Sequence, residues 1–182
     1  MKKLSIVVLL SFLCLYGVAQ TAIPCLPTWG YRVPITLDNT ANPDALTQHQ
    51  VLLEVNTQTL VSAGKMKADG GDIRFKNAAG VFLSHWIENE TMNTTNTKIW
   101  VKVDNMPMLS TIDVFMFYGQ ANANNTADGT ATFVHYDNFD GNALDFNKWT
   151  YCGGAAGGTI PVVSNGEVTL GSSSGFSGQS IS

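Results

Sequence analysis

Residues 97–103 have the sequence TKIWVKV, in which Ile99, Val101 and Val103 alternate with other residue types. Side chains of a β-strand point to opposite faces in turn, so a period of two places these three aliphatic residues on one face. A strand with such a pattern has one buried face and one wet face, as in an antiparallel sheet. The stretch therefore predicts a half-buried antiparallel strand.

The same pattern continues to both sides of this stretch. Five further strands, each bounded by turn residues, are expected at residues 31–37, 50–55, 72–76, 81–88 and 111–118. The loop at residues 77–80 is typical of a hairpin, with Gly80 suited to a positive φ angle. Only residues 58–65 and 121–128 have room for a helical turn or two. Six short strands predict an all-β fold, which we expect to be an antiparallel, jelly-roll-like β-sandwich over residues 22–133.

Residues 1–19 have the three parts of a secretory signal peptide. Two lysines precede an apolar run at residues 4–18, and Gly17 and Ala19 supply the small residues of a cleavage site. We expect cleavage after Ala19, with a cut after Gln20 as the alternative. The run is shorter than the ~20 residues that span a bilayer, which disfavours an uncleaved anchor. The protein is therefore expected to be secreted or held at the cell surface, with the periplasm as a further location.

Composition and charge exclude several partners. Charged residues make up 13% of the chain, and signal cleavage changes the formal charge from −4 to −6, because it removes two lysines and no acidic residue. An acidic chain does not neutralise nucleic-acid phosphates, so nucleic acid is not an expected partner. No other segment is long and apolar enough to predict a membrane span after cleavage.

Two cysteines remain once Cys14 leaves with the signal peptide. In an oxidising compartment, Cys25 and Cys152 are a candidate disulfide that would join the start of the first domain to the start of the second. Two unpaired thiols are the alternative, because the sequence does not give the Cα separation.

The composition changes beyond residue 136. Eight of the 17 glycines lie from Gly153 onward, and residues 164–170 are typical of a turn that leads into a strand. A disordered tail is the alternative. Large apolar side chains favour a folded segment instead: Phe139, Leu144, Phe146, Trp149, Val162, Val163, Val168 and Leu170. We expect residues 136–182 to hold the first strands of a second, incomplete β-sandwich, because two or three strands do not bury a core.

Five motifs occur in order along the first domain. They are WGYRVPI at residues 29–35, GKMKADGGDIRF at 64–75, HWIE at 85–88, KIWVKV at 98–103 and VFMFYG at 114–119. Together they resemble a bacterial and archaeal family catalogued as a domain of unknown function (DUF 2341), over about residues 28–133. The resemblance implies an exported or surface protein, often with several domains, and it brings no established catalytic activity.

Residues 137–149, DNFDGNALDFNKW, resemble the opening of a concanavalin A-like jelly roll of the laminin-G or glucanase type. This resemblance implies either a lectin-like binder or a glycoside hydrolase. The hydrolase branch keeps its two working carboxylates in a Glu-x-Asp-x-x-Glu strand, a pattern that the chain does not contain. If that branch applies, the catalytic strand lies beyond Ser182.

Aromatic residues of the strand motifs are candidates for carbohydrate binding. Trp29, Trp86 and Trp100, with Tyr31 and Tyr118, have apolar ring faces that can stack on sugar rings. Core packing is the alternative, because large aromatic side chains in strands are more often buried.

Carboxylates on glycine-containing loops offer candidate calcium sites. Asp69 and Asp72 lie on one such loop, and Asp137 and Asp140 on another. Oxygen ligands on loops suit calcium. Ordinary turn chemistry, in which aspartate accepts hydrogen bonds from nearby backbone amides, is the alternative. No other cofactor is expected.

Paired carboxylates are also found at Glu88 and Glu90, two residues apart on an expected strand. Both would face one side, at a spacing that suits glycoside hydrolysis. A solvated strand end is the alternative. The histidines at positions 49, 85 and 135 lack the spacing of metal ligands on one element.

We therefore expect a secreted or cell-surface, non-catalytic β-sandwich protein that binds carbohydrate or acts in adhesion. Its expected partner is a glycan or another cell-surface polymer. Two alternatives stay open: the N-terminal fragment of a secreted glycoside hydrolase whose catalytic residues lie beyond the chain end, and a structural spacer module.

Overall fold

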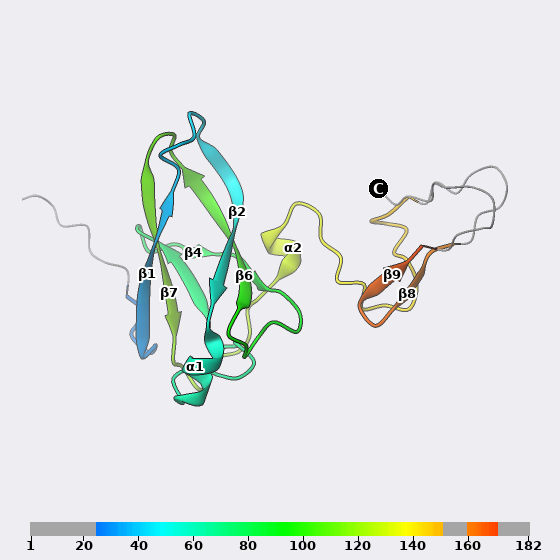
Figure 1. The fold of residues 1–182 in the computed structure, drawn as a ribbon, viewed down its shortest axis with the longest axis horizontal. Helices are drawn as coiled ribbons and strands as arrows, with labels where there is room; N and C mark the ends of the chain where they lie inside the picture. The colour runs from blue at the N-terminus through cyan, green and yellow to red at the C-terminus, as the bar shows by residue number, and fades with distance from the viewer. Residues whose placement is uncertain (1–24, 151–159, 171–182) are drawn as a thin grey trace, which may run out of the picture.

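The computed structural model describes residues 25–150 and 160–170. Its main body is a sandwich of two antiparallel sheets, which confirms the expected all-β class (Figure 1). One sheet has four strands in the order β1-β7-β3-β4, and the other has three in the order β2-β6-β5. The strands are β1 Tyr31–Asp38, β2 Leu46–Val55, β3 Arg74–Asn77, β4 Phe82–Leu83, β5 His85–Ile87, β6 Thr97–Met106 and β7 Thr111–Tyr118.

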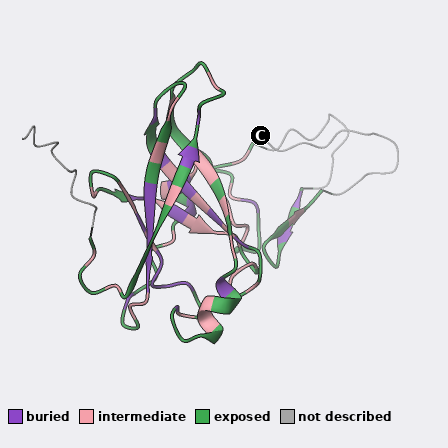
Figure 2. Ribbon diagram, turned by 60° about the vertical axis from the view of Figure 1, so that its left-hand side comes forward, coloured by how far each residue is buried: buried purple, intermediate pink, exposed green. Residues whose placement is uncertain are grey.

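The alternation in residues 97–103 holds in β6. Ile99, Val101 and Val103 point inward and are at most 2% exposed, whereas Trp100 between them is half-buried on the other face. Phe75 and Val114 of the four-stranded sheet meet them in the core and are fully buried. In Figure 2, buried residues, drawn in purple, lie along the strands of the sandwich. Removal of this apolar surface from water is the main stabilising contribution to the sandwich.

The expected single strand at residues 81–88 is divided between the two sheets. β4 pairs with β3, and β5 pairs with β6, so the chain changes sheets at Ser84. Leu83 and His85 both enter the core, with exposed fractions of 5% and 3%. The single-strand expectation was wrong here because a strand at a sandwich corner can bend from one sheet into the other.

Two short helices accompany the strands. α1, Thr57–Ser62, lies where a helical turn is expected, and the Asn56 side chain caps it by accepting a hydrogen bond from the Thr59 amide at 3.1 Å. α2, Gly129–Thr132, begins just after residues 121–128, where the second helical turn was expected. The shift follows from Asp128, whose side chain accepts the Ala131 amide at 3.0 Å and so caps the helix.

Residues 119–128, which we call the closing segment, cover the side of the sandwich where β4 and β5 are the edge strands. The Asp128 amide donates to the His85 carbonyl of β5 at 2.8 Å. Lys67 Nζ donates to the Ala123 carbonyl at 2.8 Å, and Arg74 Nη2 donates to the Asn124 carbonyl at 2.5 Å. These bonds fix the segment to β5, to the start of β3 and to the loop before β3.

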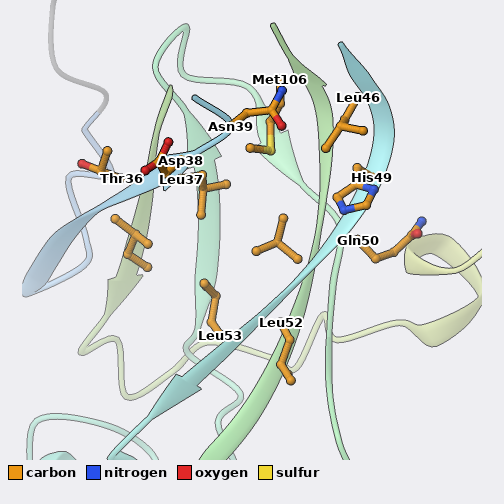
Figure 3. Close-up of a pocket in the computed structure, with 12 residues that line it drawn as sticks. Thr36, Leu37, Asp38, Asn39, Leu46, His49, Gln50, Leu52, Leu53 and Met106 are labelled. Carbon is orange, nitrogen blue, oxygen red and sulfur yellow. The ribbon is translucent and has the colours of Figure 1, made fainter. Parts of the chain in front are cut away.

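The opposite side of the sandwich, between β1 and β2, is open. Each strand has one hydrogen-bonded neighbour, β7 for β1 and β6 for β2, and the two strands do not pair with each other. A pocket of about 460 Å³ lies between them, lined mainly by aliphatic side chains (Figure 3). Leu37 and Leu53 lie in the space between the strands, while Gln50 projects to the outer side.

A separate hairpin lies beyond α2, formed by β8, Val162–Ser164, and β9, Glu167–Thr169 (Figure 1). Its turn residues Asn165 and Gly166 have φ angles of 53° and 78°, as a two-residue I′ hairpin turn requires. The turn expected within residues 164–170 is therefore confirmed. The incomplete second sandwich stays a prediction, because residues 151–159 and 171–182 lie outside the described residues.

Two further expectations concern export. The signal peptide of residues 1–19 lies outside the described residues. Within residues 25–150 and 160–170, no helix combines the length and the apolar character that a membrane crossing requires.

Candidate functional site

Trp86 and Trp100 lie opposite each other on the outer face of the three-stranded sheet. They are direct partners in the β5–β6 ladder. Their neighbours His85 and Val101 are buried in the core, so the strand period places both indoles on the other face. Both tryptophans are half-buried. Packing in the sandwich core, the alternative for these aromatic residues, therefore does not apply to this pair.

Two further aromatic rings cover this pair from the chain that follows α2. The ring centroid of Phe133 is 5.7 Å from that of Trp86 and 5.5 Å from that of Trp100. The Tyr136 ring is 5.3 Å from Trp86. The interplanar angles of 75°, 64° and 67° make all three contacts edge-to-face, a favourable geometry for aromatic pairs. We call these four residues the aromatic cluster.

The sequence around α2 holds Phe133 and Tyr136 on the sheet. Gln50 Nε2 of β2 donates to the Thr132 carbonyl at the end of α2, at 3.0 Å. The Tyr136 ring lies directly against the α-carbon of Gly129, where the methyl group of any other residue would overlap ring atoms. A glycine is needed at this position because the ring and the backbone approach so closely.

An open depression of about 600 Å³ adjoins the aromatic cluster, and we call it the Trp86 depression. Trp86 and Tyr136 supply its aromatic surface. The other lining residues are small or polar: Asn89, Asn125, Thr126, Ala127, Asp128, Gly129 and Asn138. The amide, hydroxyl and carboxylate groups in this set can both donate and accept hydrogen bonds. The depression therefore combines apolar ring surface with a polar rim.

The Tyr136 hydroxyl keeps its proton in this setting. Burial raises its pKa, a hydrogen bond from the Trp86 side chain lowers it, and the carboxylates of Asp140, Asp128 and Asp137 raise it further. The net shift is upward from an ordinary value of 10.0. At neutral pH the phenol is therefore an uncharged donor and acceptor at the edge of the depression.

Trp29 has a different position and a structural role. Its indole Nε1 donates to the Asp72 carbonyl at 2.6 Å, and the Arg74 guanidinium lies 5.4 Å from its ring centroid. Arg74 belongs to β3 of the four-stranded sheet. The three candidate tryptophans therefore do not form one platform, and only Trp86 and Trp100 are brought together.

The Asp69–Asp72 loop uses its carboxylates within the fold. Asp72 is 1% exposed, and its carboxylate accepts the amides of Gly119 at 2.7 Å and Lys67 at 3.1 Å. Asp69 accepts the Gly71 amide at 2.9 Å, which with the nearby Lys67 cation outweighs burial and holds its pKa below the ordinary value. The Asp69 contact is a turn hydrogen bond of the kind expected as the alternative to calcium, whereas Asp72 also accepts from Gly119, far along the chain.

Asp137 and Asp140 form no common ligand set with that loop. Burial raises the pKa of Asp137, but a hydrogen bond from Trp149 Nε1 at 2.7 Å and one from the Phe139 amide bring it below the ordinary value. Asp140 accepts from Asn138 Nδ2 at 2.9 Å. Within the described part of the chain, no group of three or more His, Cys, Asp or Glu side chains could hold a metal ion. Calcium binding at these loops stays a prediction.

The expected carboxylate pair at Glu88 and Glu90 does not share a strand face. β5 ends at Ile87, and Glu90 lies in a turn with a φ angle of 62°. Glu88 Oε1 lies 3.4 Å from Lys98 Nζ. The solvated strand end is therefore the better description. Of the candidate disulfide, Cys152 lies outside the described residues, so its bond to Cys25 stays a prediction.

His85 is the one histidine of the three that enters the core. Its ring lies 5.4 Å from the Phe75 ring, and its Nε2 is buried without a hydrogen-bond partner among the described residues. Burial lowers its pKa from 6.5 to about 4, the Arg74 cation lowers it as well, and a hydrogen bond to the Leu83 backbone opposes both. His85 is therefore neutral at physiological pH.

Comparison with known proteins bears on this region. Residues 69–152 match the family described as "Domain of unknown function (DUF2341)". The matched stretch contains β3 to β7, α2 and the whole aromatic cluster. It begins later than the expected resemblance over residues 28–133 and continues past the boundary expected near residue 136. No curated protein and no solved structure matches the chain. The resemblance of residues 137–149 to a concanavalin A-like domain stays a prediction.

Half of the aromatic cluster was not predicted from the sequence. Phe133 and Tyr136 were not considered as binding residues, and Tyr136 was placed at the start of the second domain, although its ring packs on Trp86. A usable signal was present in FVHY, residues 133–136, directly after a capped helical turn. The rings of this stretch contact the two outward-facing tryptophans of the adjacent strands.

Proposed function

We propose that the protein is an exported carbohydrate-binding protein and that the Trp86 depression is its binding site. The observation that carries this proposal is the position of the aromatic cluster on the outer face of a sheet, beside a rim of amide, hydroxyl and carboxylate groups. A sugar ring presents apolar C–H faces and polar edges. The ring surfaces of Trp86 and Tyr136 fit the former, and the polar rim fits the latter.

A direct test compares the purified protein with two single variants on a glycan array and in polysaccharide pull-down assays. Trp86→Ala removes the central ring, and Phe82→Ala removes an aromatic side chain that is 56% exposed on β4 and does not line the Trp86 depression. We expect Trp86→Ala to weaken glycan binding about tenfold, as loss of an aromatic stacking contact does, and Phe82→Ala to have no effect. Equal effects of the two variants, or no binding to any glycan or surface polymer, would overturn the proposal.

Export is the second part of the proposal, and it rests on the sequence of residues 1–19. Expression of the whole chain in a bacterial host and N-terminal sequencing of the protein outside the cytoplasm tests it. The expected mature N terminus is Gln20. Protein that stays in the cytoplasm with Met1 intact would contradict export without affecting the binding proposal.

A further inference from the structure

The charge of the Trp86 depression restricts what it can bind. Its lining contains one carboxylate, that of Asp128, and no Lys, Arg or His side chain. Oδ1 of Asp128 accepts the Ala131 amide at 3.0 Å. Oδ2 has no hydrogen-bond partner among the described residues. The lining Asn138 donates to Asp140 at 2.9 Å, so a second carboxylate lies next to a lining residue.

Arg74 Nη2 donates to the Asn124 carbonyl at 2.5 Å, next to the lining residue Asn125, but Arg74 itself is not part of the lining. Two lysines are held by other carboxylates. Lys148 Nζ lies 3.8 Å from Asp137, and Lys98 Nζ lies 3.4 Å from Glu88. Neither lysine lines the depression. The negative charge of Asp128 is therefore not balanced by a cation in the lining.

The rings of Trp86 and Tyr136 also favour a positively charged ligand. The indole of Trp86 and the phenol of Tyr136 both line the depression and meet at an interplanar angle of 67°, while Phe133 stacks parallel to Tyr136 at 6.1 Å. The face of an aromatic ring carries negative potential and attracts cations, most strongly in tryptophan. Ring faces and a carboxylate at one site recognise an ammonium group.

We propose that the Trp86 depression selects sugars with a free ammonium group, such as an N-unsubstituted hexosamine unit. The ammonium group lies against the ring faces and pairs with Asp128, while the ring hydroxyls contact the amides of the rim. Acidic sugars are repelled by Asp128, and N-acetylated sugars lose the charge that both contacts require. This inference rests on the proposed carbohydrate binding and names its substrate class.

The test uses three β-1,4-linked tetrasaccharides that share one backbone and differ only at C2. Tetramers of glucose, of N-acetylglucosamine and of glucosamine carry a hydroxyl, an acetamide and an ammonium group at this position. We expect the glucosamine tetramer to bind at least about fivefold more tightly than the other two in calorimetric titration. Added salt should weaken only the glucosamine complex, because screening acts on charge pairs.

Asp128→Asn removes the charge but keeps a side-chain oxygen that can cap α2. It should abolish the preference for glucosamine, so that the glucosamine and glucose tetramers bind with similar affinity. Asp113→Asn is the matched control, because it removes one exposed carboxylate from β7, where it accepts from Thr36 Oγ1 at 2.7 Å. This control should retain the preference.

The outcomes separate this inference from the proposed function. Equal binding of the three tetramers, lost in Trp86→Ala, would support carbohydrate binding and overturn the selection of ammonium. Binding of Nα-acetyl-lysine amide as tight as that of the glucosamine tetramer would overturn the assignment to sugars. Absence of binding to all tetramers and to every glycan on the array would overturn both proposals.

Discussion

The buried carboxylate of Asp72 accepts the backbone amide of Gly119 at 2.7 Å, which ties the loop before β3 to the end of β7. The Gln120 amide at 3.3 Å and the Lys67 amide at 3.1 Å complete its set of donors. Trp29 donates to the main-chain carbonyl of the same residue. Asp72 therefore joins three separate segments of the chain, and a calcium ion at this carboxylate would have to compete with these backbone amides.

Asp72→Ala should lower the free energy of unfolding by about 3 kcal/mol, because it leaves buried backbone amides without their charged acceptor. Urea denaturation of the variant checks this value. Asp69→Ala on the same loop is the control. Its carboxylate is 62% exposed and its contact with Lys67 at 3.5 Å is a surface ion pair, so we expect a loss of less than about 1 kcal/mol. Similar losses in both variants would contradict the structural role of Asp72.

Stability should fall in mild acid because of His85. Its pKa is lowered by burial to about 4 in the folded protein, from an ordinary value of 6.5. Between pH 6.5 and 4 the unfolded chain takes up a proton at this position and the folded chain does not, so acid favours unfolding. The full effect is about 3 kcal/mol and is reached below pH 4.

Urea denaturation across this pH range checks the effect in His85→Phe, which removes the titrating group. This variant should lose less stability between pH 6.5 and 4 than the parent protein. His49→Gln is the control, since His49 is exposed on β2. An unchanged acid dependence in His85→Phe would show that other groups cause it.

Leu53 and Ile99 are direct partners in the β2–β6 ladder but differ in burial. Ile99 is 0% exposed, so Ile99→Ala should cost about 3 to 4 kcal/mol through lost burial and a cavity. Leu53 lines the pocket on the open side, so Leu53→Ala should cost only about 1 to 2 kcal/mol. Chemical denaturation measures both losses. Equal losses would mean that the open side is covered in solution.

Gly129→Ala should displace the Tyr136 ring, because the added methyl group would overlap ring atoms. We expect glycan binding to weaken several-fold and tryptophan fluorescence to change, since Tyr136 contacts Trp86. Gly141→Ala is the matched control. There the nearest atoms to an added methyl group are those of the Ala143 backbone, at 3.6 Å and beyond. Normal binding by Gly129→Ala would show that Tyr136 is not needed at the site.

The strands of the sandwich could be predicted because each carries its own alternation. β1, β6 and β7 all begin at or next to the expected residues. The division of residues 81–88 could not be predicted in this way, because Leu83 and His85 keep the period of two while the chain changes sheets. The choice between partners depends on long-range contacts that a local pattern does not contain.

In the candidate site, too, the local sequence pattern predicts one feature, and contacts between distant residues determine the rest. Once Ile99 and Val101 are assigned to the core, the strand period already requires Trp100 to face outward. Trp100 is covered by Phe133, which is distant in the sequence and is positioned by the cap and the glycine of α2. Polar residues of the closing segment then form the rim, although nothing in their own sequence indicates a site.

The two sides of the sandwich are held by different numbers of bonds, and we therefore expect local unfolding to begin on one of them. β1 and β2 are each held by a single ladder, whereas the opposite edge is fastened by the closing segment through backbone and side-chain bonds. Fluctuations that expose amides to solvent deuterium should therefore begin at β1 and β2 and reach β6 and β7 last. Trp86 and Trp100 lie on β5 and β6, so the ladder that joins them should stay closed while β1 and β2 loosen.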